Sequence, residues 1–534
     1  MKPKPFINWS LAIFSLILLA GCSADATQDS NENYGELNIP IETVSLDDTA
    51  EDFSYYNLSV QDELQQQVNV LKEKQDYTFK EPLLIINPYG TNTTGLYLYF
   101  EENPGSLSYT ISAEGTSDFT RTAKDANSIE NRAEYQLIGL VPGMENRIAL
   151  TYTYENGLTK TYEFTLDAPA TQSGYPPIKK TEGAAEAKLS AGLFYTLGTD
   201  GYAGYSYVFD NDGTLRAEIV TEDYRTDRME FYKGSIVTAI SESQLARIDR
   251  LGKVVAVYNL EGFHMHHDFA LNNREQLLIL ATDESKESIE DVVLSLDLET
   301  GKYEKLIDFD GLMGSYKERT KAGKGDLNWM HFNSIDLAGD DTMLLSSRET
   351  STIIQISGIY DEPAIDYLLG NESVWADTEF ADKSLSKAGD FEYQSGQHTA
   401  TYMDDASLLD GQYYVYMFQN NYWRYTSRPD YEGLANTKAS LTWEPNNKDI
   451  SKFYKYLVDE YAGTYHLVQE FAVPYSSIVS STQIYGDSII VNSGMAKTVG
   501  EYDANGNLLA QFSYDAGLFT YRIFKDTFKG FWFE

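Results

Sequence analysis

The chain has 534 residues, a formal net charge of −40 at pH 7 and an isoelectric point near 4.4. So strong a negative charge repels polyanions, which argues against nucleic acid as a partner. The length exceeds what one small hydrophobic core can organise, so at least two domains are expected. The 41 Tyr and 25 Phe residues, with frequent apolar-polar alternation, indicate an all-β protein.

The N-terminus has the features of an export signal. Lys2 and Lys4 precede an apolar run over residues 11–20, and Cys22 follows shortly after it. This ending resembles a bacterial lipobox, so residues 1–22 are predicted to be a lipoprotein signal peptide with lipidation of Cys22. An ordinary secretory peptide with a chance cysteine is the alternative. We expect an exported protein that is lipid-anchored to the outer face of a cell membrane. Its single cysteine excludes an internal disulfide.

The next part of the chain predicts a tether and a first domain. Residues 23–58 are acidic and rich in Ser, Asn and Asp, which is typical of a flexible segment. Residues 60–74 fit a short amphipathic helix capped by Ser59. Over residues 59–168, short alternating segments separated by turn residues predict a β-sandwich of immunoglobulin or fibronectin type III kind. An edge strand of this sandwich is a candidate surface for a homodimer.

After a linker at residues 169–184, the chain repeats itself over residues 185–534. Strand, polar turn and strand recur at spacings of about 50–75 residues, which favours a β-propeller, and the length divides into about six blades. The repeating units are 205–219, 244–259, 266–309, 331–368, 398–473 and 482–512. Residues 311–328 and 420–448 are predicted to be loops over one face, and the aromatic residues of the second are candidates to line a pocket.

Five of the six histidines fall between residues 262 and 402, in three similar groups. The groups read FHMHHD at 263–268, WMHFNS at 329–334 and SGQHTA at 395–400. Equivalent positions of successive blades converge on the central channel of a propeller. We therefore expect His266 or His267, His331 and His398 to face one another at the mouth of this channel.

Other polar residues accompany these histidines. Asp268 and Asn333 stand at matching places in two of the groups, and Arg348 ends the run LLSSR. Imidazoles, an amide and a guanidinium together suit a tetrahedral oxyanion. His264, His266 and Asp268 share one face of a strand, so metal ligation is an alternative use of the first group, although we expect no metal. No Walker-type glycine loop is present, which agrees with a substrate that is not a nucleotide. We expect no cofactor.

These motifs, in this order, resemble those of the bacterial arylsulfate sulfotransferases. The stretches that carry the resemblance are NPYG at 87–90, HHDF at 266–269, DLNWMHFNSI at 326–335, LLSSR at 344–348 and GQH at 396–398. The resemblance covers nearly the whole chain from about residue 60. It implies a six-bladed β-propeller preceded by a small N-terminal β-sandwich domain. It also implies transfer of a sulfuryl group from a phenolic sulfate to a phenolic acceptor, without the nucleotide donor PAPS.

The resemblance also implies roles for individual residues. His398 matches the histidine that becomes transiently sulfated in a ping-pong reaction. Three residues match groups that bind the sulfuryl oxygens: Arg348, His331 and Asn333. Either His266 or His267 matches a further site histidine, and His267 aligns better with His398 across the repeat.

Two other functions remain open at this stage. A lipid-anchored propeller can bind a glycan, a peptide or a protein without catalysis. A hydrolase would pass the sulfuryl group of an aryl sulfate to water and would need no phenolic acceptor.

Overall fold

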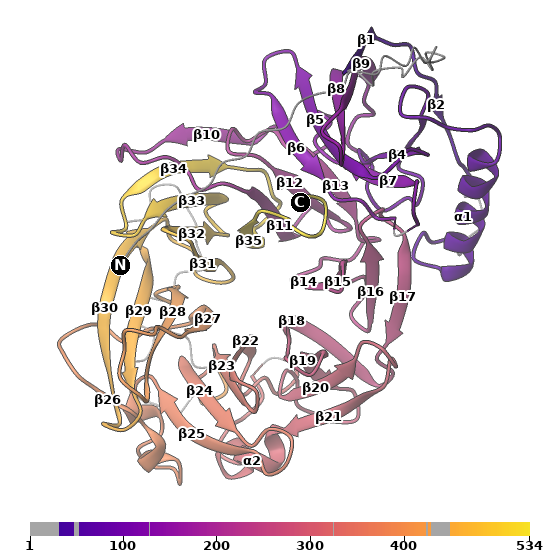
Figure 1. The fold of residues 1–534 in the computed structure, drawn as a ribbon. Coiled ribbons are helices and arrows are strands. Elements are labelled where there is room, and N and C mark those ends of the chain that lie inside the picture. Colours follow the sequence, from indigo (N-terminus) through magenta and orange to yellow (C-terminus); the bar gives the residue numbers. More distant parts are fainter. Residues whose placement is uncertain (1–30, 47–52, 128, 324, 423–425, 429–448) are drawn as a thin grey trace, which may run out of the picture.

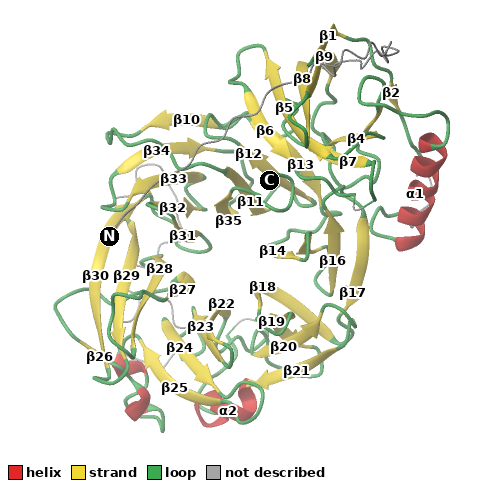
Figure 2. Ribbon diagram, in the orientation of Figure 1, coloured by secondary structure: helices red, strands yellow, loops and turns green. Residues whose placement is uncertain are grey.

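The computed structural model describes residues 31–46, 53–127, 129–323, 325–422, 426–428 and 449–534. The predicted signal peptide, Cys22 and most of the 420–448 segment lie outside these residues. Within them the chain forms a ring of sheets with a smaller β domain beside it (Figure 1, Figure 2). The prediction of an all-β protein is confirmed. No helix in the described part is long and apolar enough to cross a membrane.

The N-terminal domain consists of two packed sheets. One has the strand order β1 (Glu32–Glu36), β9 (Thr159–Asp167), β8 (Glu145–Tyr154), β5 (Gly105–Ala113) and β6 (Phe119–Ala123). The other has the order β2 (Ile41–Glu42), β3 (Leu83–Ile86), β4 (Leu96–Phe100) and β7 (Ala133–Leu137). Alternate residues of β5 and β8 are buried between the two sheets, and the residues between them lie on the outer, more exposed face of their sheet.

Part of the predicted tether is instead built into this domain. Strand β1 pairs in parallel with β9, and β2 pairs in parallel with β3. Leu37, Ile39 and Ile41 pack against the sandwich core. Both strands cover sheet edges whose backbone groups would otherwise lack partners. Apolar side chains occupy every second position of residues 37–41, which makes the strand pairing favourable. This short pattern is difficult to recognise within a segment that is acidic overall.

A single amphipathic helix, α1 (Leu58–Lys72), lies against the sandwich. Its buried side chains include Leu64, Val68 and Leu71, which recur at helical spacing, so the expected apolar face is confirmed. The predicted cap, Ser59, lies two residues after the observed one. Asn57 accepts a hydrogen bond from the backbone N–H of Ser59 and is the N-cap.

The described residues after the sandwich form six further sheets around a central axis (Figure 1). Written from the innermost strand outward, the first three are β35 (Thr520–Asp526), β11 (Leu193–Thr199), β12 (Tyr205–Phe209) and β13 (Leu215–Val220); β14 (Met229–Tyr232), β15 (Ser235–Ala239), β16 (Gln244–Asp249) and β17 (Val254–Asn259); and β18 (Phe263–Leu271), β19 (Gln276–Asp283), β20 (Val292–Asp297) and β21 (Tyr303–Asp308). The other three are β22 (Phe332–Gly339), β23 (Thr342–Ser347), β24 (Thr352–Ser357) and β25 (Ala364–Leu369); β27 (His398–Met403), β28 (Gln412–Gln419), β29 (Ser451–Asp459), β30 (Thr464–Val473) and β26 (Ser386–Lys387); and β31 (Ser481–Tyr485), β32 (Ser488–Ser493), β33 (Thr498–Asp503), β34 (Leu508–Ser513) and β10 (Lys179–Glu182).

The two ends of this region cross over to close the ring. The C-terminal strand β35 pairs with β11, so the last inner strand belongs to the first sheet. Conversely, β10 pairs with β34 on the outside of the last sheet. Residues 179–182 were predicted to be linker, but they form this outer strand. Each crossover replaces a free sheet edge with backbone hydrogen bonds, which holds the ring shut.

Short helices occupy the longer connections between sheets. The segment predicted as a loop at 311–328 begins within α2 (Phe309–Lys317). Two 3-10 turns, η1 (Glu372–Val374) and η2 (Ala381–Lys383), follow β25. Phe309, Met313 and Tyr316 of α2 are buried in the core of the third and fourth sheets, which explains why a helix forms there.

Candidate active site

The inner strands bring the predicted site residues together because neighbouring strands keep a common register. A side chain on one inner strand accepts a hydrogen bond from a backbone N–H of the next. These bonds run from Ile335 N to Asp268 Oδ2, from Ala400 N to Ser334 Oγ and from Ile523 N to Ser481 Oγ. The register makes His267, Asn333 and His398 equivalent, which agrees with the alignment of His267 with His398. His331 lies two residues before the equivalent position, so its predicted equivalence is only approximate.

The backbone of the inner strands is strained at or near the histidine positions. His267, His331, Thr399 and Ser480 have φ of +59°, +48°, +55° and +90°. Such left-handed conformations cost about 1–3 kcal/mol each for residues other than glycine and cluster at functional sites. The register of each pair β18–β19, β22–β23 and β27–β28 also shifts at this point. These bulges turn the histidines away from the regular pleat.

His398 is buried and is held by one ring nitrogen. Its Nδ1 lies 2.9 Å from the carbonyl oxygen of Gly396 and 2.8 Å from Oδ1 of Asn420. The Asn420 amide is oriented because its Nδ2 donates to the carbonyl oxygens of Ser476 and Val479. Both partners of Nδ1 are therefore acceptors, so Nδ1 carries the proton. The lone pair of His398 is then on Nε2.

The surroundings of His398 keep its ring neutral. Burial lowers the pKa of His398 from its ordinary value of 6.5 to about 3, and the nearby His331 and Arg348 act in the same direction. The hydrogen bonds from Asn420 and Gly396 oppose this shift but do not offset it. A neutral imidazole with a free lone pair is the form that acts as a nucleophile. Asn420 lies in no histidine group and belongs to no motif, so no signal in the sequence pointed to it.

His266 and His267 lie side by side near the channel axis. Their ring centroids are 5.1 Å apart, and His267 is 5.0 Å from His331. Tyr521 stacks on His267 at 5.5 Å and meets His398 edge-on at 6.2 Å, so it spaces these two rings. Burial lowers the pKa of both His266 and His267. None of their four ring nitrogens has a hydrogen-bond partner among the described residues.

His331 contacts a mostly buried carboxylate to which no sequence motif pointed. Its Nδ1 lies 2.6 Å from Oε2 of Glu290. Asn328 also approaches this oxygen, with Nδ2 at 2.8 Å. The ring of His331 is mostly buried between these groups and His267.

Arg348 follows β23 and is anchored through its backbone. Its N–H donates to the carbonyl oxygen of His331 at 3.1 Å. The guanidinium is about one-quarter exposed and lies 3.5 Å from Oε2 of the buried Glu349. Glu349 also accepts hydrogen bonds from Ser427 and Thr426 through its other oxygen. Arg348 is thus a cation beside His398. Its long ion pair with Glu349 neutralises this charge only in part.

Asn333 links two of the histidine groups. Its side chain is fully buried, and Nδ2 donates to the carbonyl oxygen of Gln397 at 2.7 Å. This bond uses one of the two amide hydrogens and joins β22 to the residue before His398. The Nδ2 atom carries a second hydrogen, and Oδ1 has no hydrogen-bond partner among the described residues. The binding of sulfuryl oxygens by Asn333 stays a prediction.

The metal-binding alternative for the first histidine group is not supported in the form proposed. His264 is about half exposed and pairs with Glu284, whereas Asp268 is buried and pairs with Arg522 at 2.6 Å. The bulge between Met265 and Phe269 separates them. A different set, His266, His267 and Glu290, has ligand atoms within 4.8 Å of one another.

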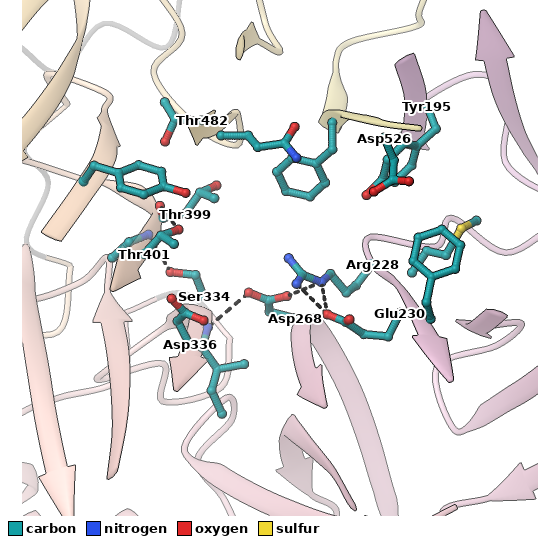
Figure 3. Close-up of a pocket in the computed structure, with 17 residues that line it drawn as sticks. Tyr195, Arg228, Glu230, Asp268, Ser334, Asp336, Thr399, Thr401, Thr482 and Asp526 are labelled. Atoms are coloured by element: carbon teal, nitrogen blue, oxygen red, sulfur yellow. Dashed lines mark hydrogen bonds and ion pairs between the residues drawn. The ribbon is translucent and has the colours of Figure 1, made fainter. Parts of the chain in front are cut away.

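A cavity of about 270 Å³ lies elsewhere in the channel and is lined by residues of all six inner strands (Figure 3). Of the residues singled out from the sequence, Asp268 lines it, whereas the histidines, Asn333 and Arg348 do not. Arg228 is bound there by Glu230 and faces Asp268. Burial raises the pKa of Asp336 to about 6, and Asp526 is a further carboxyl group. These carboxyl groups repel an anionic substrate from the cavity. The histidine cluster is therefore the better candidate for the reacting site.

The fold and this site define a two-domain β-propeller protein with a mostly buried cluster of histidines beside an arginine. Residues 179–520 match the sequence model of the Arylsulfotransferase (ASST) family, and residues 83–169 match that of the Arylsulfotransferase Ig-like domain. The first match covers more than half of the chain, so the protein belongs to the arylsulfotransferase family. It is a sulfotransferase enzyme, which uses a sulfate donor and an acceptor.

Other comparisons add little to this assignment. No curated protein matches the chain significantly. Among solved structures, BamB from Moraxella catarrhalis is 10% identical, with 64% of this chain and 92% of that chain covered and a TM-score of 0.32. Streptogramin B lyase is 10% identical, with 65% and 100% covered and a TM-score of 0.29. The WD40 domain of Toxoplasma gondii coronin is 9% identical, with 65% and 76% covered and a TM-score of 0.30.

Proposed function

We propose that the protein is a PAPS-independent arylsulfate sulfotransferase that moves a sulfuryl group between phenols through sulfated His398. The observation that carries this proposal is the state of His398. Its Nδ1 proton is held by two acceptors, its ring is neutral, and its Nε2 lone pair is available. A nucleophilic histidine needs these three properties together.

In the first half-reaction, Nε2 of His398 attacks the sulfur of a phenolic sulfate. The N–S bond forms as the bond from sulfur to the phenolic oxygen breaks, and the electron pair leaves on the phenolate. A histidine of the cluster donates a proton to that oxygen. The sulfated ring carries a positive charge, which the carbonyl oxygens of Gly396 and Asn420 stabilise through the Nδ1 proton.

Arg348 and His331 face the charge on the oxygens of the transferred group. Arg348 supplies a permanent positive charge beside His398. A phenolic acceptor then gives its proton to a cluster histidine and attacks sulfur, and the N–S bond breaks to restore His398. Because donor and acceptor use one site in turn, the kinetics are of the ping-pong type.

The cellular location is part of the same proposal. The sequence before Cys22 has the charged and apolar regions of an export signal. Lipidation of Cys22 would tether the enzyme to the outer face of a membrane. Mass spectrometry of the protein purified from membranes tests this, because a diacylglyceryl group on Cys22 is expected, and a free Cys22 thiol would refute it.

The decisive experiment measures nitrophenol release from p-nitrophenyl sulfate by residues 23–534, with and without added phenol. Release that depends on phenol is expected. The His398→Ala variant should retain less than about a thousandth of it, because it lacks the nucleophile. His264→Ala is the matched control, since His264 is an exposed histidine paired with Glu284 and should leave turnover unchanged.

Each alternative gives a distinct result. Release without phenol would identify a hydrolase. No release with any phenol would favour a binding propeller. Undiminished transfer by His398→Ala would remove His398 as the nucleophile. Mass spectrometry after exposure to donor alone should show one sulfuryl group on the peptide that contains His398.

A further inference from the structure

A buried glutamate lies in the site without a role in the chemistry proposed above. Glu290 stands in the connection between β19 and β20, with a left-handed φ of +59°. Its backbone N–H donates to Oγ1 of Thr282 at 2.9 Å, which fixes the residue in this turn. Its side chain is about 16% exposed and points toward the histidine cluster. A strained residue whose carboxylate enters a site calls for a functional reason.

The contacts of Glu290 determine the proton positions on His331. Oε2 accepts from His331 Nδ1 at 2.6 Å and from Asn328 Nδ2 at 2.8 Å. Nδ2 of Asn328 also lies 2.7 Å from Nδ1 of His331. If Nδ1 carried a lone pair, it would face the negatively charged oxygen at 2.6 Å. Nδ1 therefore carries a proton, and Nε2 is the nitrogen left for the reacting group.

The cluster keeps this carboxylate ionised. Burial alone would raise the pKa of Glu290, but His331, His266 and His267 hold it well below its usual range. His267 lies 3.8 Å from the same oxygen. The negative charge of Glu290 thus faces three imidazoles, and only His331 forms a short hydrogen bond with it.

We propose that Glu290 is a positioning residue that makes His331 the proton donor to the departing phenolate. The carboxylate holds Nδ1–H and stabilises a second proton on Nε2, which passes to the phenolic oxygen as its bond to sulfur breaks. In the second half-reaction, Nε2 takes the proton from the acceptor phenol. Glu290 itself stays ionised throughout. This inference rests on the proposed sulfuryl transfer.

The first test compares donors whose leaving phenols differ in acidity. Glu290→Gln keeps the size of the side chain and removes its charge. The more acidic p-nitrophenol leaves as its anion without needing a proton, whereas the less acidic phenol needs one. For Glu290→Gln we expect kcat/KM to fall about 100-fold or more with phenyl sulfate, and by less than about tenfold with p-nitrophenyl sulfate. A merely structural defect would lower both values by the same factor.

Two further variants control this comparison. Glu290→Asp keeps the charge, so its kcat/KM with phenyl sulfate should be at least about tenfold higher than that of Glu290→Gln. Glu284→Gln is the matched control, because Glu284 makes a similar contact with His264, 2.7 Å from Nε2, outside the site. It should change neither rate. Equal losses with both donors in Glu290→Gln would overturn the proposal.

A spectroscopic readout separates this inference from the proposed function. With only six histidines, selectively ¹⁵N-labelled protein should show a slowly exchanging Nδ1 proton of His331, assigned through His331→Gln. The signal should disappear in Glu290→Gln and persist in Glu284→Gln. If the signal persists in Glu290→Gln, the proposal for Glu290 is refuted and the proposed sulfotransferase function is not affected. A different outcome is that the signal disappears in Glu290→Gln as expected but the wild-type protein transfers no sulfuryl group. That result would confirm the contact between Glu290 and His331 and refute the sulfotransferase chemistry on which the catalytic role depends.

Discussion

At the scale of single residues, the site works because each histidine has different partners. His398 has two acceptors on Nδ1, His331 has a carboxylate, and the rings of His266 and His267 have no hydrogen-bond partner in the described part of the chain. The same side chain is thereby prepared for different tasks. Asn420 and Glu290 decide two of these tasks, although neither stands in a histidine motif.

The neutral state of His398 predicts a measurable loss of stability in acid. In the unfolded chain His398 binds a proton near pH 6.5, but in the folded protein only near pH 3. Between these values the unfolded state binds more protons, so stability falls as the pH falls. From pH 7 to pH 5 this one group should lower the free energy of unfolding by about 2 kcal/mol.

Urea unfolding of wild type and His398→Gln at both pH values checks this prediction. The variant should lose about 2 kcal/mol less than wild type between pH 7 and pH 5. His264→Gln, at an exposed position, should keep the wild-type pH dependence. An identical pH dependence in His398→Gln would show that the imidazole is not held neutral.

At the scale of secondary structure elements, closure of the ring depends on a buried ion pair between the last and first sheets. Lys525 of β35 and Glu501 of β33 are both fully buried, with Nζ 2.7 Å from Oε2. Nζ also contacts Ser190 and Asn211, which lie near the first strands of the ring. Burial lowers the pKa of Lys525, and the Glu501 carboxylate opposes this.

Breaking this pair should destabilise the protein strongly. Glu501→Gln leaves Lys525 without its counter-charge, and we expect a loss of about 3–5 kcal/mol, measured by urea unfolding. The double variant Glu501→Leu with Lys525→Met should recover most of this loss, because it removes both buried charges. A single variant as stable as wild type would show that the pair does not hold the sheets together.

At the scale of the whole molecule, the C-terminal segment links the propeller to the sandwich. Residues 527–534 leave β35 and pack on the N-terminal domain, where Trp532 Nε1 donates to Gln136 Oε1 at 3.0 Å. Phe533 bridges to Ala123, and Phe531, Trp532 and Phe533 are nearly fully buried. Arg216 adds hydrogen bonds from the first blade to the carbonyl oxygens of Gly139 and Ser117.

Deletion of residues 527–534 should therefore uncouple the two domains. Each buried aromatic side chain contributes about 1.5–3 kcal/mol, so the deletion removes much of the interface. We expect calorimetry to show one unfolding transition for the intact protein and two for the truncated one. Lys529→Ala, at an exposed position of the same segment, should retain a single transition. A single unchanged transition after truncation would mean that the remaining contacts suffice.

The fold class could be predicted from the sequence because it depends on local patterns. Alternating apolar residues, turn residues and a repeat at fixed spacing are visible along the chain, and they indicated a sandwich followed by a propeller. The edges of the domains could not be predicted in this way. β1, β2 and β10 are short and polar, and each exists because a distant sheet edge accepts its backbone hydrogen bonds.

The sequence by itself determined which rare residues gather, because histidines that recur in a repeat must meet at the axis of a propeller. Only the tertiary structure decided what each does. The proton positions on His398 and His331 depend on Asn420 and Glu290, which lie 22 and 41 positions away along the chain. Asn333 is oriented in the same way, since its amide donates to the carbonyl oxygen of Gln397, the residue before His398. Hydrogen-bond partners of a buried side chain are set by three-dimensional proximity, which no local pattern encodes.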